Sequence, residues 1–182
     1  VLNGTFGSET VPKIGKNFGV AEFSINFDRI KLTFNLKHDM KKLAIGVDIG
    51  GINTAFGLVD ENGDLYAESV ISTKKYPYVD DYPAYVEMLV RTLRELCAAM
   101  PAGAVLSGIG IGAPNANYHT GRIERPVNLW KFRSGEPNPE EGRRFFSLCK
   151  EVGNSFPGIP VRITNDANAA ALGEIAYGNA CL

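Results

Sequence analysis

Three short polar clusters contain the residues with the clearest capacity for chemistry. They occupy residues 48–54 (DIGGINT), 112–115 (GAPN) and 165–168 (NDAN). Each cluster follows a short apolar run that is typical of a buried strand. In an open α/β sheet, ligands bind beyond the carboxyl ends of the strands, so the three clusters are expected to converge on one edge. That edge is the candidate functional site.

The first cluster is a glycine turn that is suited to holding phosphate. Because Gly50 and Gly51 lack a Cβ, backbone N–H groups there can approach and cradle phosphate oxygens. Asp48 could hold Mg²⁺ through water, since that ion prefers carboxylate oxygens and keeps much of its hydration. The alternative is a tight hairpin whose glycines serve geometry alone, because short glycine motifs often occur without a ligand.

The third cluster offers a proton acceptor. An Asp at the tip of a strand that faces a phosphate loop can accept a proton from a sugar hydroxyl as that hydroxyl attacks a γ-phosphoryl group. Asp166 is the residue in this position. The alternative is a structural role, because Asp166 or Asn168 is also well placed to cap the Ala-rich helix that follows.

A dinucleotide-binding fingerprint is excluded by spacing. Gly108, Gly110 and Gly112 form G-x-G-x-G inside a strand pattern. Pro114 and a long polar loop follow, where a pyrophosphate site would need a helix N-terminus.

The elements that must position these clusters follow from periodicity. Apolar runs predict five strands, at residues 43–49, 54–59, 65–71, 105–111 and 161–164. Asn62-Gly63 predicts a hairpin between the second and third strands, because both residues tolerate positive φ. The first three strands therefore form an antiparallel meander.

Three helices are predicted around this sheet. The first is capped by Asp80 or Asp81 and ends before Gly103. The second opens at residues 138–141 (NPEE) and buries a stripe of apolar side chains, and the third spans residues 169–177. The stripe consists of Phe145, Leu148, Cys149 and Val152. The order predicts a mixed five-stranded α/β sheet of the ribonuclease-H-like kind, with helices on both faces.

Composition limits the partners. The 182 residues are 45% hydrophobic and carry 19 Lys plus Arg against 20 Asp plus Glu, so no basic footprint for nucleic acid or an acidic membrane surface exists. Three cysteines far apart in the sequence indicate neither a disulfide framework nor a zinc site. No run approaches the ~20 apolar residues of a membrane span, and no export signal begins the sequence. We expect a cytoplasmic protein with a small-molecule ligand.

Residues 1–39 differ from the rest. They carry scattered Gly, Asn and Lys without a sustained period, and Met40 stands directly before the first strong strand. We therefore expect a leader of uncertain structure, outside the native domain, which starts at Met40. Residues 21–27 alternate like a half-buried strand, so local structure is expected there.

Three stretches together resemble one known family. Residues 47–54 (VDIGGINT), 108–114 (GIGIGAP) and 164–174 (TNDANAAALGE) resemble the glucokinase-like members of the ROK family (repressors, open reading frames and kinases) in order and spacing. The resemblance runs from about Lys41 to the end of the chain. It implies the N-terminal lobe of an actin-like ATPase fold. It also implies ATP- and Mg²⁺-dependent phosphorylation of a hexose or N-acetylhexosamine.

The resemblance also implies roles for single residues. By position, Asp166 resembles the catalytic base and Asn165 its sugar-hydroxyl partner. Asn128 resembles another sugar contact, and Asn115 lies in the loop that lines the sugar site. The residues that match the phosphate-binding turn are Gly50, Gly51, Asn53 and Thr54.

Two departures from the family pattern affect the expected activity. Ile52 stands where the family usually has Thr, so a hydroxyl contact to phosphate, a hydrogen bond of about 0.5–1.5 kcal/mol, is absent. Family members also continue into a second lobe with the adenosine site, further sugar ligands and a structural zinc cluster. We therefore expect the chain as given to be inactive alone, and the full-length protein to be a homo-oligomer.

The family also contains sugar-responsive repressors, which gives an alternative function. Repressors carry a helix-turn-helix domain ahead of the sugar domain. Residues 1–39 lack a pair of amphipathic helices with a basic recognition face. A sugar-binding regulator or inactive relative therefore stays as the second hypothesis.

Overall fold

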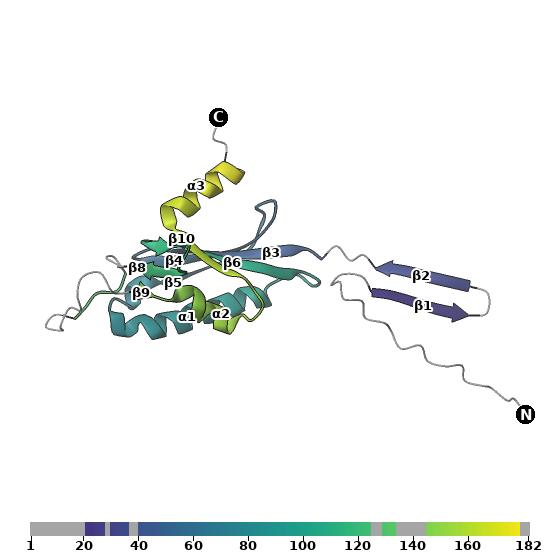
Figure 1. Ribbon diagram of the computed structural model, residues 1–182, viewed down its shortest axis with the longest axis horizontal. Helices are drawn as coiled ribbons and strands as arrows, with labels where there is room; N and C mark the ends of the chain where they lie inside the picture. The colour runs from purple at the N-terminus through teal and green to yellow at the C-terminus, as the bar shows by residue number, and fades with distance from the viewer. Residues whose placement is uncertain (1–20, 28–29, 37–39, 125–128, 134–144, 179–182) are drawn as a thin grey trace, which may run out of the picture. The chain divides into compact units, whose positions relative to one another are not determined.

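A computed structural model describes residues 21–27, 30–36, 40–124, 129–133 and 145–178 (Figure 1). The chain divides into two compact units, Val1–Met40 and Lys41–Leu182. In the first unit, β1 (Ala21–Phe27) pairs antiparallel with β2 (Ile30–Leu36). The alternating segment of the sequence is thus a strand of a hairpin.

The second unit is built on a mixed five-stranded sheet in the order β10-β6-β3-β4-β5. The antiparallel meander consists of β3 (Lys42–Ile49), β4 (Asn53–Asp60) and β5 (Leu65–Ser72). Parallel to β3 lies β6 (Val105–Ala113), and parallel to β6 lies β10 (Val161–Asn165). All five predicted strands and their directions are confirmed.

The two faces of this sheet differ in side-chain size. One face carries a buried aliphatic layer, made of Leu43, Ile45, Val47, Ile49, Leu58, Ile109 and Ile111. The strand alternation turns small residues to the other face, which carries Ala44, Gly46, Ala55, Gly57, Gly108, Gly110 and Gly112. Because side chains alternate along each strand, one face is packed with large side chains and the other, which we call the smooth face, carries small ones.

Helices lie on both faces, as predicted (Figure 1). The helices α1 (Tyr82–Ala98) and α2 (Leu148–Ser155) cover the aliphatic face, and α3 (Asp166–Tyr177) rises from the opposite one. Buried positions of α1 recur at helical spacing, from Tyr85 through Leu89 to Leu93, because this stripe packs against the sheet. Burial of these large side chains supplies the main stabilisation of the unit.

The expected helix at residues 138–141 lies outside the described residues, and one part of that prediction is wrong. Phe145 belongs to β9 (Phe145–Phe146), not to a helical stripe, and α2 begins only at Leu148. The strand forms because Phe146 packs against Tyr82 and Trp130, with ring centroids 4.3 and 4.7 Å away. These contacts hold the chain extended before the helix starts.

Several short elements were not predicted. A small sheet joins β9 to β8 (Arg122–Glu124) and β8 to β7 (Ala116–Asn117). Single 3₁₀ turns, η1 (Thr73–Lys75) and η2 (Val79–Asp81), connect β5 to α1. Within the described part of the chain, no helix has the length and apolar character to cross a bilayer.

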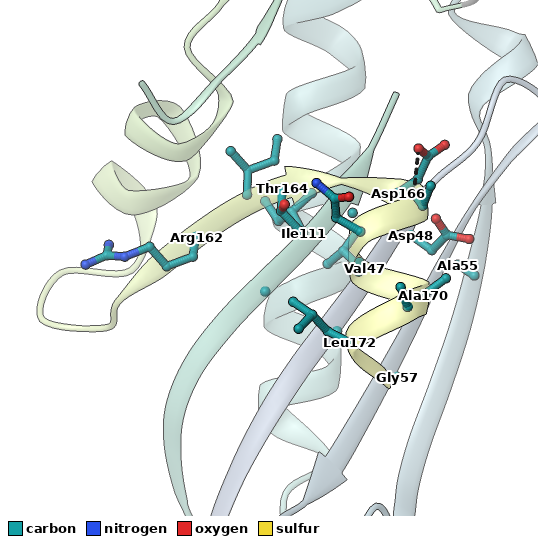
Figure 2. A pocket seen from close by; sticks show the side chains of 18 of the residues that line it. Val47, Asp48, Ala55, Gly57, Ile111, Arg162, Thr164, Asp166, Ala170 and Leu172 are labelled. Atoms are coloured by element: carbon teal, nitrogen blue, oxygen red, sulfur yellow. Dashed lines mark hydrogen bonds between the residues drawn. The ribbon is translucent and has the colours of Figure 1, made fainter. Parts of the chain in front are cut away.

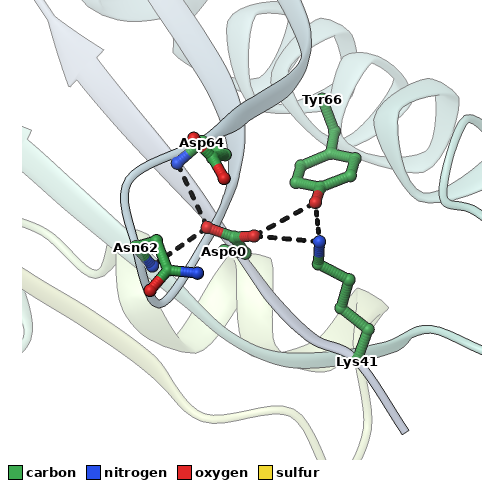
Figure 3. Close-up of polar contacts among 5 residues, drawn as sticks. All are labelled: Lys41, Asp60, Asn62, Asp64 and Tyr66. Atoms are coloured by element: carbon green, nitrogen blue, oxygen red, sulfur yellow. Dashed lines mark hydrogen bonds and ion pairs between the residues drawn. The ribbon is translucent and has the colours of Figure 1, made fainter.

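The predicted hairpin between β4 and β5 is present and is fastened by one carboxylate (Figure 3). Gly63 has φ 84°. The Asp60 side chain is almost fully buried; its Oδ1 accepts backbone N–H groups of Asn62 and Asp64 at 2.9 and 3.1 Å. Its Oδ2 accepts the Tyr66 hydroxyl at 3.0 Å and pairs with the Lys41 amine at 3.0 Å. The hydrogen bond from Lys41 lowers the pKa of Asp60 most strongly.

This network predicts a pH-dependent loss of stability in Asp60→Asn. A carboxyl whose folded pKa is depressed stabilises the fold above its unfolded pKa of about 3.9, and this contribution disappears as pH falls through the folded pKa. At pH 7 the variant should unfold at lower urea concentration than the wild type, because the ion pair with Lys41 is gone. Between pH 7 and pH 3 its urea midpoint should fall less than that of the wild type.

Asp64→Asn is the matched control, since it removes an exposed charge from the same turn. Its urea midpoints should follow those of the wild type at both pH values. Equal acid sensitivity of the Asp60→Asn variant and the wild type would contradict the role given to the buried carboxylate.

Candidate functional site

The three polar clusters meet at one edge of the sheet. Asp48 on β3 is paired in register with Gly112 on β6, and Gly112 is paired with Thr164 on β10. These three neighbouring strands run parallel, so the segments after them leave the sheet side by side. The register thus produces the convergence that the sequence predicted.

Close packing at Gly112 brings two carboxylate residues together (Figure 2). A Cβ on Gly112 would lie 3.6 Å from the Cα of Asp166 and 3.8 Å from Oδ1 of Asp48. The same position would be 3.3 Å from the Cβ of Ala169 on α3, tighter than ordinary contact. Glycine at this position therefore lets α3 start directly against the sheet, with Asp166 beside Asp48.

A groove of about 1440 Å³ opens over this junction (Figure 2). Asp48, Gly50 and Asp166 all line it, and its floor is the smooth face of the sheet. The side chains of Asp48 and Asp166 lie close to each other at one end, while Leu172 on α3 lies at the other (Figure 2). The glycine turn and the predicted base therefore share one open space.

The glycine turn presents free backbone donors. The Gly50 N–H donates to the Asn53 carbonyl at 2.9 Å, and a Cβ on Gly50 would be only 3.1 Å from that oxygen. The amides of Gly51 and Ile52 donate to no other described residue. The Ile52 side chain is 68% exposed. Two adjacent unpaired N–H groups at an exposed turn are the arrangement that binds anions.

The two residues after the turn have different environments. Asn53 is exposed at the start of β4, whereas Thr54 is fully buried on the aliphatic face. The Thr54 hydroxyl lies 2.8 Å from the Thr73 hydroxyl and 2.8 Å from the Tyr85 hydroxyl. Its side chain therefore faces α1 and not the groove.

Asn165 and Asp166 form the junction of β10 and α3. Asn165 is the N-cap, and its Oδ1 accepts the Ala167 N–H at 3.0 Å. The Asp166 Oδ1 accepts the same N–H at 2.9 Å. Capping was expected from Asp166 or Asn168, but the residue in the cap position is Asn165, so α3 starts three residues earlier than predicted. The NH₂ group of Asn165 is not used in the cap.

The remaining predicted sugar contacts lie away from the groove lining or outside the described residues. Asn115 is exposed in the turn after β6 with φ 54°, and its carbonyl accepts the Glu124 N–H at 2.9 Å. Positive φ is a conformation that Asn tolerates better than most residues. Asn128 lies outside the described residues.

Sequence reasoning missed three groove residues, Arg162, Thr164 and Glu68. Arg162 is exposed and Thr164 half-buried on β10, and the Arg162 Nη1 donates to the Val161 carbonyl at 3.0 Å. The signal was the alternation V-R-I-T-N, which turns Arg162 and Thr164 to the face opposite Val161. Thr164 brings a hydroxyl to the groove, whereas the Arg162 side chain points away from Asp166 and α3 (Figure 2).

The side chains at the site fit a hydrated Mg²⁺ ion better than a metal held by protein ligands alone. Among the described residues, no group of three or more His, Cys, Asp or Glu side chains lies together. A dedicated all-protein cage would need such a group, whereas Mg²⁺ is held by one or two carboxylates together with water and phosphate oxygens. The exposed Asp48, beside the free amides of the turn, fits the second arrangement.

Curated proteins similar to this chain include glucokinases. The chain is 34% identical to a glucokinase of Streptomyces coelicolor over 136 residues, which is 75% of this chain and 36% of the relative. It is 28% identical to a glucokinase of Thermotoga maritima over 134 residues, 74% of this chain and 37% of that relative. The chain thus spans little more than a third of the curated relatives it matches.

Solved structures agree with the fold. A ROK family glucokinase from Streptomyces griseus in complex with glucose and AMPPNP has a TM-score of 0.53 and 29% identity, over 76% of this chain and 38% of that one. A ROK transcriptional regulator, at 18% identity and a TM-score of 0.55, shares the fold alone. The sheet and its helices are therefore those of an actin-like ATPase lobe. Because the ROK family model also matches residues 44–181, the chain belongs to the ROK family.

Proposed function

We propose that the Lys41–Leu182 unit is the N-terminal lobe of an ATP-dependent sugar kinase that phosphorylates a hexose or N-acetylhexosamine. One observation carries the proposal: Asp48 and Asp166 meet over Gly112, in the groove that the glycine turn also lines. Phosphoryl transfer needs a phosphate cradle, a site for Mg²⁺ and a proton acceptor within one cleft. The similarity to glucokinases supports the sugar as acceptor.

Each residue has a distinct part in this reaction. The free amides of Gly51 and Ile52 bind phosphate oxygens of ATP, and Asp48 holds Mg²⁺ through water. Mg²⁺ held there would neutralise charge that develops on the phosphoryl group. Asp166 accepts the proton of the sugar hydroxyl as it attacks, and Asn165 binds another hydroxyl of the sugar. Asn115 and Asn128 are proposed as further sugar contacts, although Asn115 does not line the groove. Asn53 and Thr54 shape the phosphate turn.

The setting of the unit is part of the same proposal. The boundary at Met40 supports residues 1–39 as a leader outside the native domain. The relatives are longer than the matched region, and the family's second lobe would supply the adenosine site. A structural zinc would need ligands beyond the described residues, which contain no such cluster. We expect a cytoplasmic homo-oligomer at full length, and no turnover by the lobe alone.

Asp166→Asn in a full-length protein that carries this lobe should lower kcat for sugar-dependent ADP formation by about 10² to 10⁴. The amide keeps the shape of the side chain but cannot accept the hydroxyl proton. Asp64→Asn, in the β4–β5 turn and not among the groove-lining residues, is the control with the same chemical change and should keep wild-type turnover. An Asp166→Asn enzyme with undiminished kcat removes Asp166 from the base role.

The same assay separates the kinase from a sugar-binding regulator. Calorimetric sugar binding by the wild-type protein without ADP release, at every Mg²⁺ concentration, would identify the regulator and overturn the proposal.

A pair of glycine variants tests the packing that forms the site. In Gly112→Ala the new methyl group meets the Cβ of Ala169 at 3.3 Å, so α3 and Asp166 must shift by a few tenths of an ångström. Because a 1 Å misplacement of a catalytic group costs about 10²-fold, kcat should fall several-fold to about tenfold. Gly153→Ala on α2 adds the same methyl group where nothing lies within 4 Å and outside the groove lining, and kcat should not change. Equal kcat values for the two variants would contradict the packing argument.

Ile52→Thr should tighten ATP binding. A hydroxyl at the exposed turn would add one hydrogen bond to phosphate, worth about 0.5–1.5 kcal/mol, which corresponds to a KM for ATP about 2- to 12-fold lower. Ile52→Val keeps the β-branch without a hydroxyl and should leave KM unchanged. If both variants show the wild-type KM, position 52 does not touch the nucleotide.

A further inference from the structure

Three hydroxyl groups are buried together directly beneath the glycine turn. Thr54 and Tyr85 are fully buried, and Thr73 is 2% exposed. The Thr54 Oγ1 lies 2.8 Å from the Thr73 Oγ1 and 2.8 Å from the Tyr85 oxygen, so one hydroxyl joins the other two. We refer to Thr54, Thr73 and Tyr85 as the hydroxyl cluster.

The hydroxyl cluster connects three elements at the back of the turn. Thr54 is the second residue of β4, Thr73 opens η1, and Tyr85 lies in the first turns of α1. Next to Thr73, the Lys74 N–H donates to the Ile52 carbonyl at 3.0 Å. Two contacts therefore hold the turn in place: the main-chain hydrogen bond from Lys74 to Ile52, and the hydrogen bonds of the Thr54 side chain.

Burial keeps the Tyr85 phenol protonated. It raises the pKa of Tyr85 above its ordinary value, and the neutral phenol shares one hydrogen bond with the Thr54 hydroxyl, in which either oxygen can be the donor. The Tyr85 ring itself is fixed by edge contacts with Tyr76 and Trp130, at centroid distances of 5.7 and 5.4 Å. A rigid hydrogen-bond partner for Thr54 restrains the χ1 angle of that side chain and, through it, the start of β4.

Packing alone does not account for these hydroxyls. The neighbouring positions on the same faces of β4 and α1 are occupied by apolar residues, including Phe56, Leu58 and Leu89. Apolar side chains of similar volume would fill such a space without the requirement that every polar group find a partner. Hydroxyls add orientation, because a hydrogen bond weakens steeply when its angle changes.

We propose that Tyr85 and Thr73 are positioning residues that act through Thr54 to hold the glycine turn in the conformation that presents the Gly51 and Ile52 amides. That these amides bind nucleotide phosphate rests on the proposed function. The cluster itself touches no ligand; it determines where the donors of the turn point.

The experiment compares two tyrosine variants in the full-length protein. Tyr85→Phe removes the hydroxyl that reaches Thr54 and leaves the ring in place. Tyr82→Phe is the matched control, because Tyr82 is also buried on α1 and its hydroxyl makes no hydrogen bond to the hydroxyl cluster. Amide hydrogen exchange at Gly50 and Lys74, whose N–H groups are hydrogen-bonded within the turn or to it, is measured together with KM for ATP, KM for sugar and kcat.

In Tyr85→Phe, exchange at Gly50 and Lys74 should rise about fivefold, the equilibrium shift from the loss of one typical hydrogen bond, while exchange in α1 and β3 stays at the wild-type rate. KM for ATP should rise by a similar factor, with smaller changes in kcat and in KM for sugar. Tyr82→Phe should change none of these. Thr54→Val should behave as Tyr85→Phe does, and Thr54→Ser, which keeps the hydroxyl, should return most of the lost affinity for ATP.

Two results would overturn the inference. Exchange of Gly50 and Lys74 at the wild-type rate in Tyr85→Phe would show that the cluster does not hold the turn. An equal increase throughout the unit would show a general loss of stability and no local role. Should the wild-type protein not turn over ATP, the proposed kinase function fails, and the exchange comparison still decides whether the cluster orders the turn.

Discussion

The arrangement of the site depends on close contact between α3 and the sheet at Gly112. The position that a side chain would occupy there is taken by Ala169, by the backbone of Asp166 and by the carboxylate of Asp48. Any larger residue would separate the helix from the strands and draw the two carboxylates apart. The in-register pairing of β3, β6 and β10 then determines which residues share this edge. The chemistry of the groove thus follows from backbone proximity before any individual side chain is considered.

The two faces of the sheet have different roles: one packs against helices and the other lines the groove. Aliphatic side chains of β3 and β4 pack on the face that α1 and α2 cover, so the ends of these strands are held rigidly. The opposite face is smooth, and the groove lies above it. Functional groups stand at the ends of rigid strands or on the first residue of a helix, where their backbone positions are determined by regular structure. The glycine turn is the least regular part. It is anchored by the hydrogen bond between Thr54 and Tyr85 and by the hydrogen bond from the Lys74 N–H to the Ile52 carbonyl.

Much of this could be predicted from the sequence, because five strands and α1 each carry a period long enough to be recognised. The short strands β7 to β9 could not, since two or three residues have no period. The strand β9 forms because Phe146 packs against Tyr82 and Trp130, which are distant in sequence. Convergence of Asp48 and Asp166 followed from strand order. The alternation of Thr54 with Phe56 and Leu58 predicts that Thr54 is buried, whereas the family motif predicts a phosphate contact at this position.

Asp166 is the first residue of α3, where extended chain becomes helix. Ile175 lies nine residues further along, about 13 Å away at 1.5 Å per residue, and is 79% exposed. A tilt of α3 by about 10° around its first residue would therefore move Ile175 by about 2 Å and leave Asp166 almost stationary. Such a change of tilt would alter the outline of the groove, which Leu172 and Ile175 line, while the proposed proton acceptor stays in place.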